Sequence, residues 1–340
     1  MPVSDAIPRR PRLWSFLPLA LLVVLAAAWT LTAVSFQVPG GWRWPVTALV
    51  GMAACGILYI SWYRRLRGWL ALFLGLVLVT VWWSSIQPSA ERDWAPDVAR
   101  IATAQIDGNR VTVHDVRNFD WRSETDFTPR WETRTYDLNG LQGVDLVTSV
   151  WANPAIAHTL VSFAFADGQH LVFSVEIRRE RTEVFSEIGG FFKEFELAMI
   201  AADENDIVRL RTDARGETVS LFPLNVTPEQ ARKLFLSYLA RTNALVDKPE
   251  FYQTITSNCT TVIFRLARLV APGLPMDWRI LLSGYVPDYL HDHGALRTSL
   301  SLDETKRAAV IHRKPGDASP AGTFSADIRA ASPLYGAGVR

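Results

Sequence analysis

The chain opens with long apolar runs and changes, near residue 90, to segments in which apolar and polar residues alternate. Three runs, over residues 13–36, 45–63 and 69–86, approach the roughly 20 residues that a helix needs to cross about 30 Å of hydrocarbon. Tryptophans gather at their ends, as is typical of membrane interfaces. We therefore expect a membrane anchor of three transmembrane helices over residues 1–88 and a separate domain over residues 89–340. The first run could instead be a cleaved signal peptide, but its length and the two runs after it favour a span.

The rest of the chain shows the periodicities of both strands and helices. Alternating or short apolar segments predict strands over residues 110–116, 130–136, 146–150, 158–165, 169–178, 194–201 and 206–212. Helices are predicted over 227–245, opened by Thr227 as N-cap, and from about Asn258 to Val270. Residues 87–97 have the composition of a linker, and the mixed pattern of residues 301–340 predicts loose packing. Together these elements indicate the α+β class.

The strands 158–165 and 169–178 carry enough pattern to predict how they pair. Their apolar residues share one face of the sheet only if the connecting loop has three residues, with Gly168 in a left-handed conformation. A two-residue turn would put the two apolar sets on opposite faces. The three-residue loop places His158 opposite Glu176 on the other face, with their Cβ atoms about 5 Å apart.

Charge predicts how the chain is oriented in the membrane. The net charge is +1 with 20% charged residues of both signs, so nothing favours nucleic acid as a partner. Basic residues precede the first run (Arg9, Arg10, Arg12) and separate the second from the third (Arg64, Arg65, Arg67), whereas Arg43 alone lies between the first and second. The positive-inside rule then puts the N-terminus in the cytoplasm and residues 89–340 outside it. In a Gram-negative bacterium this is an inner-membrane protein with a periplasmic domain.

The chain has two cysteines, and they are placed very differently. Cys55 lies in the middle of the second span, where we expect it to pack. Cys259 lies in the predicted first turn of a helix, where unpaired N–H groups and partial positive charge favour a thiolate. The alternative is that Cys259 is a small buried apolar residue.

A nucleophilic thiol needs a base, and His158 is the histidine best placed to be oriented by a carboxylate, that of Glu176. Cys, His and an orienting carboxylate are the parts of an activated nucleophile. The alternative is a cross-strand His–Glu pair at the surface.

Two further motifs invite a functional interpretation. His291 and His293 are two residues apart, but no other ligand pattern lies nearby, so we expect no metal and no other cofactor. The aromatic and arginine-rich stretch 118–131, which includes Arg122, is either a packed loop with a strand or a substrate-facing surface near the membrane.

Four segments, 157–165, 174–180, 209–212 and 258–261, resemble the periplasmic N-terminal domain of the intramolecular lipoprotein N-acylation transferases. The resemblance extends over roughly residues 92–335, and it implies a circularly permuted papain-like (NlpC-like) fold. It implies Cys259 as the nucleophile and His158 as the base. In that transferase the domain precedes its membrane helices, whereas here three apolar runs precede the domain. For contacts with a substrate we expect Arg178, Asn258 and Arg122.

The function expected from these features is a membrane-anchored Cys–His acyltransferase that acts on a membrane lipid or lipoprotein through a thioester on Cys259. The alternatives are a cysteine peptidase or amidase acting on cell-wall peptide, and an envelope binding module without activity. An apolar groove favours the first, a polar open groove the second, and a long Cys259–His158 separation the third. The oligomeric state stays open.

Overall fold

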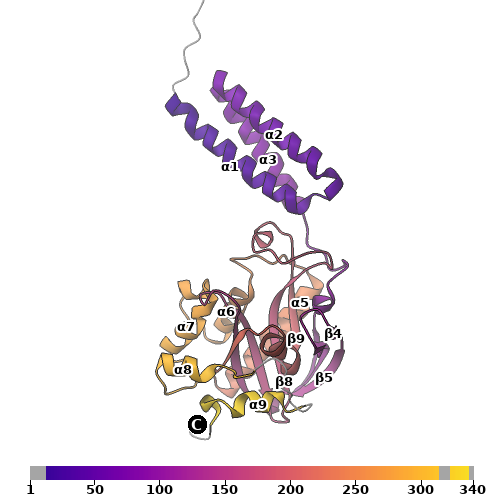
Figure 1. Cartoon of the computed structure of the whole chain (residues 1–340), viewed down its shortest axis with the longest axis vertical. Helices are drawn as coiled ribbons and strands as arrows, with labels where there is room; N and C mark the ends of the chain where they lie inside the picture. The colour runs from indigo at the N-terminus through magenta and orange to yellow at the C-terminus, as the bar shows by residue number, and fades with distance from the viewer. Residues whose placement is uncertain (1–12, 314–321, 337–340) are drawn as a thin grey trace, which may run out of the picture. The chain divides into compact units, whose positions relative to one another are not determined.

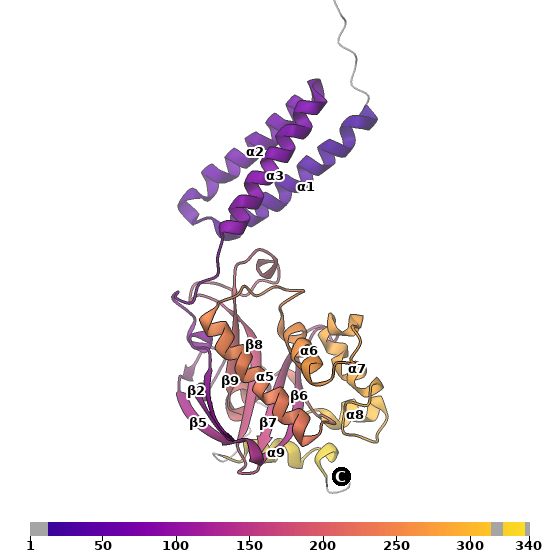
Figure 2. The same ribbon diagram turned by 180° about the vertical axis from the view of Figure 1, so that it is seen from behind.

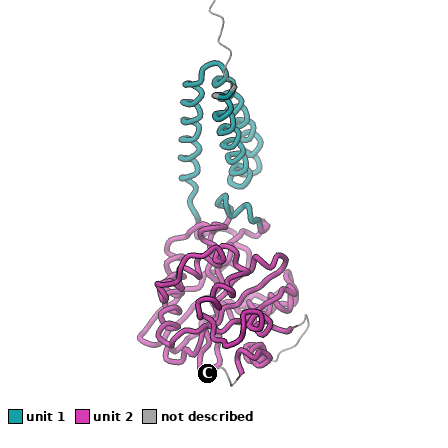
Figure 3. The backbone as a smooth tube through the Cα atoms, turned by 90° about the vertical axis from the view of Figure 1, so that its left-hand side faces the viewer, with its two compact units in different colours: residues 1–88, 186–194 teal, residues 89–185, 195–340 magenta. Residues whose placement is uncertain are grey.

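The computed structural model describes residues 13–313 and 322–336. The chain divides into two compact units, coloured in Figure 3. One unit comprises residues 1–88 together with 186–194, and the other comprises residues 89–185 and 195–340. The short segment 186–194 therefore belongs with the N-terminal helices, although the sequence pattern places it inside the second domain.

The first unit is built on the three apolar runs. They form α1 (Leu13–Gln37), α2 (Gly40–Tyr63) and α3 (Arg65–Ser85), and among the described residues these are the helices long and apolar enough to cross a membrane. The three predicted helices are confirmed. The expectation for Cys55 is wrong, because its side chain is exposed on α2. Arg9, Arg10 and Arg12 lie outside the described residues.

The second unit is organised around a mixed sheet (Figure 1). Its strands in the described part of the chain are β1 (Thr103–Asp107), β2 (Arg110–Arg117), β5 (Trp131–Asp137), β6 (Leu141–Val150), β7 (His158–Phe165), β8 (His170–Arg178), β9 (Glu196–Ala202) and β10 (Thr218–Pro223). They follow the order β1-β2-β9-β8-β7-β6-β10, with β5 also paired to β2. All pairs are antiparallel except a single parallel bridge between β2 and β9. A separate hairpin consists of β3 (Asp120–Trp121) and β4 (Phe127–Thr128).

The β7–β8 hairpin has the predicted register. Phe163 pairs with Leu171 and Val161 pairs with Phe173. Gly168 has φ 84°, the left-handed conformation that the three-residue loop requires. The alternating apolar residues Val161, Phe163, Leu171 and Phe173 therefore share one face, and His158 and Glu176 lie on the other.

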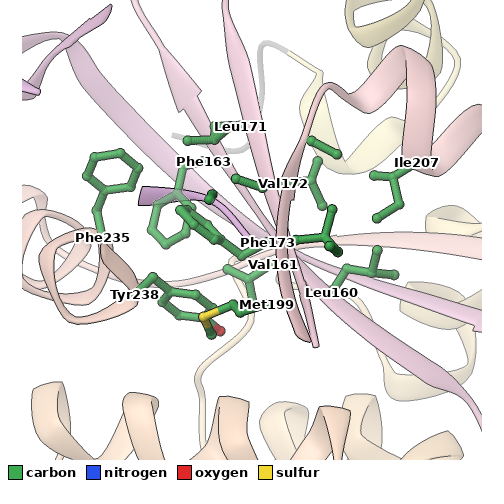
Figure 4. Close-up of a cluster of buried hydrophobic side chains, with 14 of the residues drawn as sticks. Leu160, Val161, Phe163, Leu171, Val172, Phe173, Met199, Ile207, Phe235 and Tyr238 are labelled. Atoms are coloured by element: carbon green, nitrogen blue, oxygen red, sulfur yellow. The ribbon is translucent and has the colours of Figure 1, made fainter. Parts of the chain in front are cut away.

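The apolar face of the sheet is covered by α5 (Pro228–Asp247) and α6 (Cys259–Val270), as Figure 2 shows for α5. Thr227 caps α5 by accepting a hydrogen bond from the Gln230 N–H at 3.2 Å. Phe235 and Tyr238 of α5 pack on the rings of Phe163 and Phe173, at centroid distances of 5.0 and 5.1 Å (Figure 4). This aromatic packing fixes α5 against the sheet.

The other face is covered by helices that the sequence pattern did not predict correctly. Residues 206–212, expected to form a strand, lie instead in α4 (Glu204–Arg209) and a π-helical turn (Leu210–Ala214). The prediction is wrong because Asp203 caps a helix here, accepting from the Asn205 N–H at 2.8 Å, and the apolar residues turn toward the sheet at helical spacing. Ile207 lies on the side of the sheet opposite Phe235 (Figure 4).

The C-terminal segment also packs more closely than predicted. Beyond α7 (Val286–Asp292), its described part forms α8 (Leu302–Ala309) and α9 (Phe324–Ala330). Phe324 and Ile328 are buried in the main core, and Arg329 pairs with Glu204 at 2.7 Å. The expectation of loose packing is therefore wrong for the described residues, since both apolar burial and a buried ion pair hold this segment.

Candidate active site

Cys259 is the first residue of α6, and the residue before it fixes the start of this helix. The Asn258 side-chain oxygen accepts from the Thr261 N–H at 2.8 Å, and the Asn258 N–H donates to the Thr261 hydroxyl at 3.0 Å. This reciprocal capping box anchors the first turn. The helix start lies against the beginning of β7, where the hydroxyls of Thr159 and Thr260 are 3.3 Å apart. The thiol is therefore held beside the first residues of β7.

His158 opens β7 and is bonded on the side away from the thiol. Its Nε2 lies 2.7 Å from the Ser174 hydroxyl and 3.1 Å from a Glu176 carboxylate oxygen. Ser174 donates in turn to Glu176 at 2.6 Å. Because Nε2 is engaged with these two residues, Nδ1 is the nitrogen left to face the Cys259 thiol, whose pKa the imidazole lowers.

The pKa values of the thiol and the imidazole shift in opposite directions. Burial raises the pKa of Cys259, but the hydrogen bond and charge of His158, with further bonds from Thr159, outweigh it and lower this pKa to about 6. Burial and the charge of Arg211 lower the pKa of His158, but Glu176 and Cys259 outweigh them and raise it to about 9. Between these values the pair is a thiolate facing an imidazolium, which is the reactive form of a cysteine nucleophile.

Three residues that sequence reasoning missed extend the site beyond Glu176: Ser174, Arg211 and Glu217. Arg211 Nη2 lies 3.2 Å from Glu176, and its Nη1 lies 3.3 Å from Glu217, which also accepts from Ser149. Although burial raises the pKa of Glu176, His158 and Arg211 hold it well below its ordinary value.

Arg211 belonged to a segment, 209–212, that the resemblance already singled out. The sequence pattern does not identify Arg211 as a site residue, because it predicts a strand over this segment. The π-helical turn turns Arg211 into the site, in line with the frequent use of such turns at functional positions.

The residues expected to bind substrate are not all drawn together. The Arg178 guanidinium donates to the carbonyls of Val98 and Ala99 at 3.2 and 2.7 Å, and it lies over the Trp94 ring. Burial lowers its pKa to about 10. Arg178 therefore anchors the segment before β1.

The other two residues that we expected to contact a substrate are also hydrogen-bonded to residues near them in the chain. Asn258 is taken up by the cap of α6, and its amide donates to the Thr254 carbonyl at 2.7 Å. Arg122 is half exposed in the β3–β4 hairpin, where it bonds Asp126 and Thr128.

An apolar pocket lies between α6, the sheet and the segment that follows α6, and its lining includes Thr159 and Thr260, the residues that follow His158 and Cys259 in the chain. The walls are almost wholly apolar and include Val161, Ile263, Phe264, Ile280, Val286 and Leu290. It encloses about 560 Å³ of space, part of which is open to solvent.

The paired histidines have other partners. His291 Nε2 lies 3.1 Å from the Leu300 carbonyl, and His293 Nδ1 lies 2.7 Å from the Tyr289 carbonyl. Within residues 13–313 and 322–336, no three His, Cys, Asp or Glu side chains gather as a metal site would need. Both histidines therefore serve local structure in the region of α7.

Comparison with known proteins identifies one family. The sequence model of a family described as the Lnb N-terminal periplasmic domain matches residues 127–284. The matched segment contains His158, Glu176, Arg211, Glu217 and Cys259. No curated protein and no solved structure gives a significant match.

Proposed function

Since residues 127–284 belong to the Lnb N-terminal periplasmic domain family, we propose that this chain is a membrane-anchored Cys–His acyltransferase acting on a lipid or lipoprotein. The observation that carries the proposal is a thiol with a depressed pKa, paired with His158, one residue from Thr260 in the lining of an apolar pocket. A thiolate supplies the nucleophile, and the pocket suits an acyl chain. A polar, open groove would have favoured the hydrolysis of cell-wall peptide instead.

The proposed reaction has two steps. The Cys259 thiolate attacks the ester carbonyl of an acyl-bearing lipid, a C–S bond forms, the ester C–O bond breaks, and the His158 imidazolium gives its proton to the departing alkoxide. An amine then attacks the thioester and loses its proton to His158, and the C–S bond breaks to restore the thiolate. Backbone N–H groups at the start of α6 are suited to stabilise the oxyanion in both steps.

Glu176 and Arg211 are proposed to set the state of the imidazole rather than to touch the substrate. Glu176 holds His158 through Nε2, which keeps Nδ1 toward the thiol. Arg211 keeps Glu176 ionised and moderates its effect, because the same guanidinium lowers the pKa of His158. Both are therefore positioning residues.

We also propose that the fold is a circularly permuted papain-like one. A cysteine at the start of a helix packs on an antiparallel sheet, and the histidine on that sheet precedes the cysteine in the chain. The family description and the arginine distribution support a location in the inner membrane of a Gram-negative bacterium, with the N-terminus in the cytoplasm and the domain in the periplasm.

Intact mass spectrometry of the full chain, purified from membranes, tests the proposal. The expected result is an acyl adduct on Cys259 that neutral hydroxylamine removes, as it removes thioesters. A Cys259→Ser variant should lack the hydroxylamine-sensitive adduct, and a Cys55→Ser variant should keep it. If the adduct is absent when the protein is incubated with diacyl lipid and with lipoprotein, the acyltransferase proposal is wrong. Release of cell-wall peptide fragments in the same assay would favour the amidase.

A further inference from the structure

Two segments beside His158 expose large apolar side chains. The loop between β6 and β7 exposes Trp151 and Ile156, the former to 52%. The segment after α6 exposes Met276, Trp278, Leu281 and Leu282, with Trp278 at 57% and Leu281 at 50%. We call these six side chains the apolar rim. Exposed apolar groups of this size, when clustered, mark a surface that meets another apolar phase.

The two segments form one surface, because their backbones are bonded to each other. The Gly284 N–H donates to the Ala155 carbonyl at 3.0 Å, and the Ala157 N–H donates to the Ser283 hydroxyl at 2.8 Å. A Cβ on Gly284 would lie 1.9 Å from the Pro154 carbonyl oxygen, so the contact depends on glycine. Since His158 follows Ala157 directly, the rim adjoins the site.

The rim is poor in charge for an exposed surface. Residues 151–157 have no charged side chain, and residues 276–285 have only Asp277 and Arg279. These two pair with each other at 2.8 Å, and Arg279 also pairs with Asp292 at 2.6 Å. Soluble surfaces usually carry about a quarter to a third charged residues. The rim is therefore unlike a surface adapted to water.

The inner side of the same segment lines the apolar pocket that Thr159 and Thr260 also line. Leu274, Ile280 and Val286 contribute to the pocket walls, whereas Met276, Trp278 and Leu281 point outward and are exposed. One stretch of chain therefore has an apolar surface on both sides.

The chain connects this end of the sheet to the membrane helices. β8 and β9 are joined at the end of the sheet that carries Glu176, and the middle of their connection, 186–194, belongs to the helical unit. There Phe192 packs on Trp29 and Trp83, and the Lys193 ammonium donates to the carbonyls of Trp83 and Ile86 at the end of α3. Trp83 lies near the end of α3, and a tryptophan at a helix end is typical of the membrane interface.

From these observations we propose that the apolar rim contacts the lipid of the membrane that α1, α2 and α3 span. The partner is a bilayer surface rather than a protein, because the site end of the sheet is covalently continuous with a loop held at the end of a membrane helix. Tryptophan and leucine are the side chains that such an interface favours. The proposal goes beyond the acyltransfer reaction and does not depend on it.

The test uses the full chain in liposomes, with Cys55→Ser and Cys259→Ser so that each added cysteine is the sole labelling site. An environment-sensitive fluorophore is attached at Leu281→Cys and, in a separate protein, at Trp278→Cys. The matched control is Ala166→Cys, exposed at the opposite end of the β7–β8 hairpin. Fluorescence is measured with nitroxide-labelled lipids and, separately, with aqueous iodide.

We expect nitroxide lipids to quench the fluorescence of the labels at positions 281 and 278, and iodide to leave it unchanged. At position 166 we expect iodide to quench the fluorescence and nitroxide lipids to leave it unchanged. Quenching of both rim labels by iodide alone would overturn the proposal. Shielding from both quenchers would also overturn it, because in pure liposomes it would mean contact between copies of this chain. Since the catalytic thiol is absent from all three proteins, a negative result leaves the proposed acyltransfer unaffected.

Discussion

Two buried ionic clusters lie on the same face of the sheet and use the same kinds of side chain. The site cluster consists of His158, Glu176, Arg211 and Glu217. The tail cluster consists of Asp145, Ser162, Glu204, Arg329 and Tyr335. Each is centred on one arginine between two carboxylates, but they differ in how completely they are satisfied.

In the tail cluster the arginine and both carboxylates are paired by hydrogen bonds. Arg329 bonds Glu204 through two nitrogens, at 2.8 and 2.7 Å, and bonds Asp145 at 2.6 Å. Ser162 and Tyr335 donate the remaining bonds to these carboxylates. Although burial raises the pKa of Glu204, Arg329 outweighs it and lowers this pKa to about 2, far from neutral pH. Its titration can affect stability but cannot supply a group that changes charge near pH 7.

The site cluster, by contrast, is incompletely hydrogen-bonded and partly exposed. Arg211 Nε is buried with no hydrogen-bond partner among the described residues, and the Glu176 side chain is 20% exposed. The pKa shifts here bring Cys259 to about 6 and His158 to about 9, one on each side of neutrality. Buried charge alone therefore does not indicate a candidate active site, whereas a thiol and an imidazole whose pKa values lie on either side of neutrality do.

Removing the centre of the tail cluster should have the largest effect on stability. Arg329→Ala leaves Glu204 and Asp145 buried without a counter-charge, which costs about 3–5 kcal/mol and lowers Tm by roughly 6–20 °C. Thermal unfolding of the detergent-solubilised protein measures this. The reactivity of Cys259, assayed well below Tm, should not change. A large loss of thiol reactivity would show that the two clusters are coupled.

The matched change in the site cluster should affect both stability and titration. Arg211→Ala leaves Glu176 with His158, and Glu217 with the more distant Arg215, as the remaining ionic partners, so Tm should fall, but by less than in Arg329→Ala. Because the Arg211 charge lowers the pKa of His158, its removal should move the upper limb of the pH–activity profile above about 9. A profile that coincides with that of the native protein would leave Arg211 with a structural role only.

Replacing Glu176 should narrow the pH range of activity with a smaller loss of stability. Glu176→Gln keeps a hydrogen-bonding group but removes the charge that raises the pKa of His158, so this pKa should fall by about one to three units. The imidazolium is then lost at lower pH, and the upper limb moves down. This is the direction opposite to that of Arg211→Ala. Equal shifts in the two variants would contradict the assigned roles.

The smallest loss of stability is expected from a change in the loop of the β7–β8 hairpin, whose strands carry residues of both clusters. Gly168 has φ 84° and open space around its missing Cβ, so Gly168→Ala should cost only the strain of a left-handed residue, about 1–2 kcal/mol. Gly168→Asn is the control, since asparagine adopts this conformation more readily. Neither change should alter Cys259 reactivity. A loss of reactivity would mean that the register had slipped.

The features predictable from the sequence were those fixed by local pattern. Alternation of apolar residues and one glycine were enough to pair β7 with β8 and to set His158 opposite Glu176. The position of Cys259 at a helix start was predictable because Asn258 caps the helix within three residues. In both cases the information lies within a short stretch of chain.

The features that were missed depend on partners distant in sequence. Glu204 is buried because Arg329, 125 residues later, neutralises it. The burial of Arg211 likewise depends on Glu176, 35 residues earlier. A charged residue shows no local sign of such pairing, so residues 206–212 were predicted as a strand and the C-terminal segment as loose. The docking of residues 186–194 on the membrane helices was hidden for the same reason.

The central claim is that Cys259 is an activated nucleophile, and the pH dependence of its reaction with a small neutral disulfide tests it most directly. In the full chain with Cys55→Ser, the rate should fall as the pH drops through about 6, where the thiolate takes up a proton. In His158→Ala the inflection should move to the ordinary thiol value near 9 or above. At pH 7 that variant has roughly 90-fold less thiolate, partly offset by higher nucleophilicity, so its rate should be roughly fivefold lower. A native inflection near 9, unchanged by His158→Ala, would contradict the account.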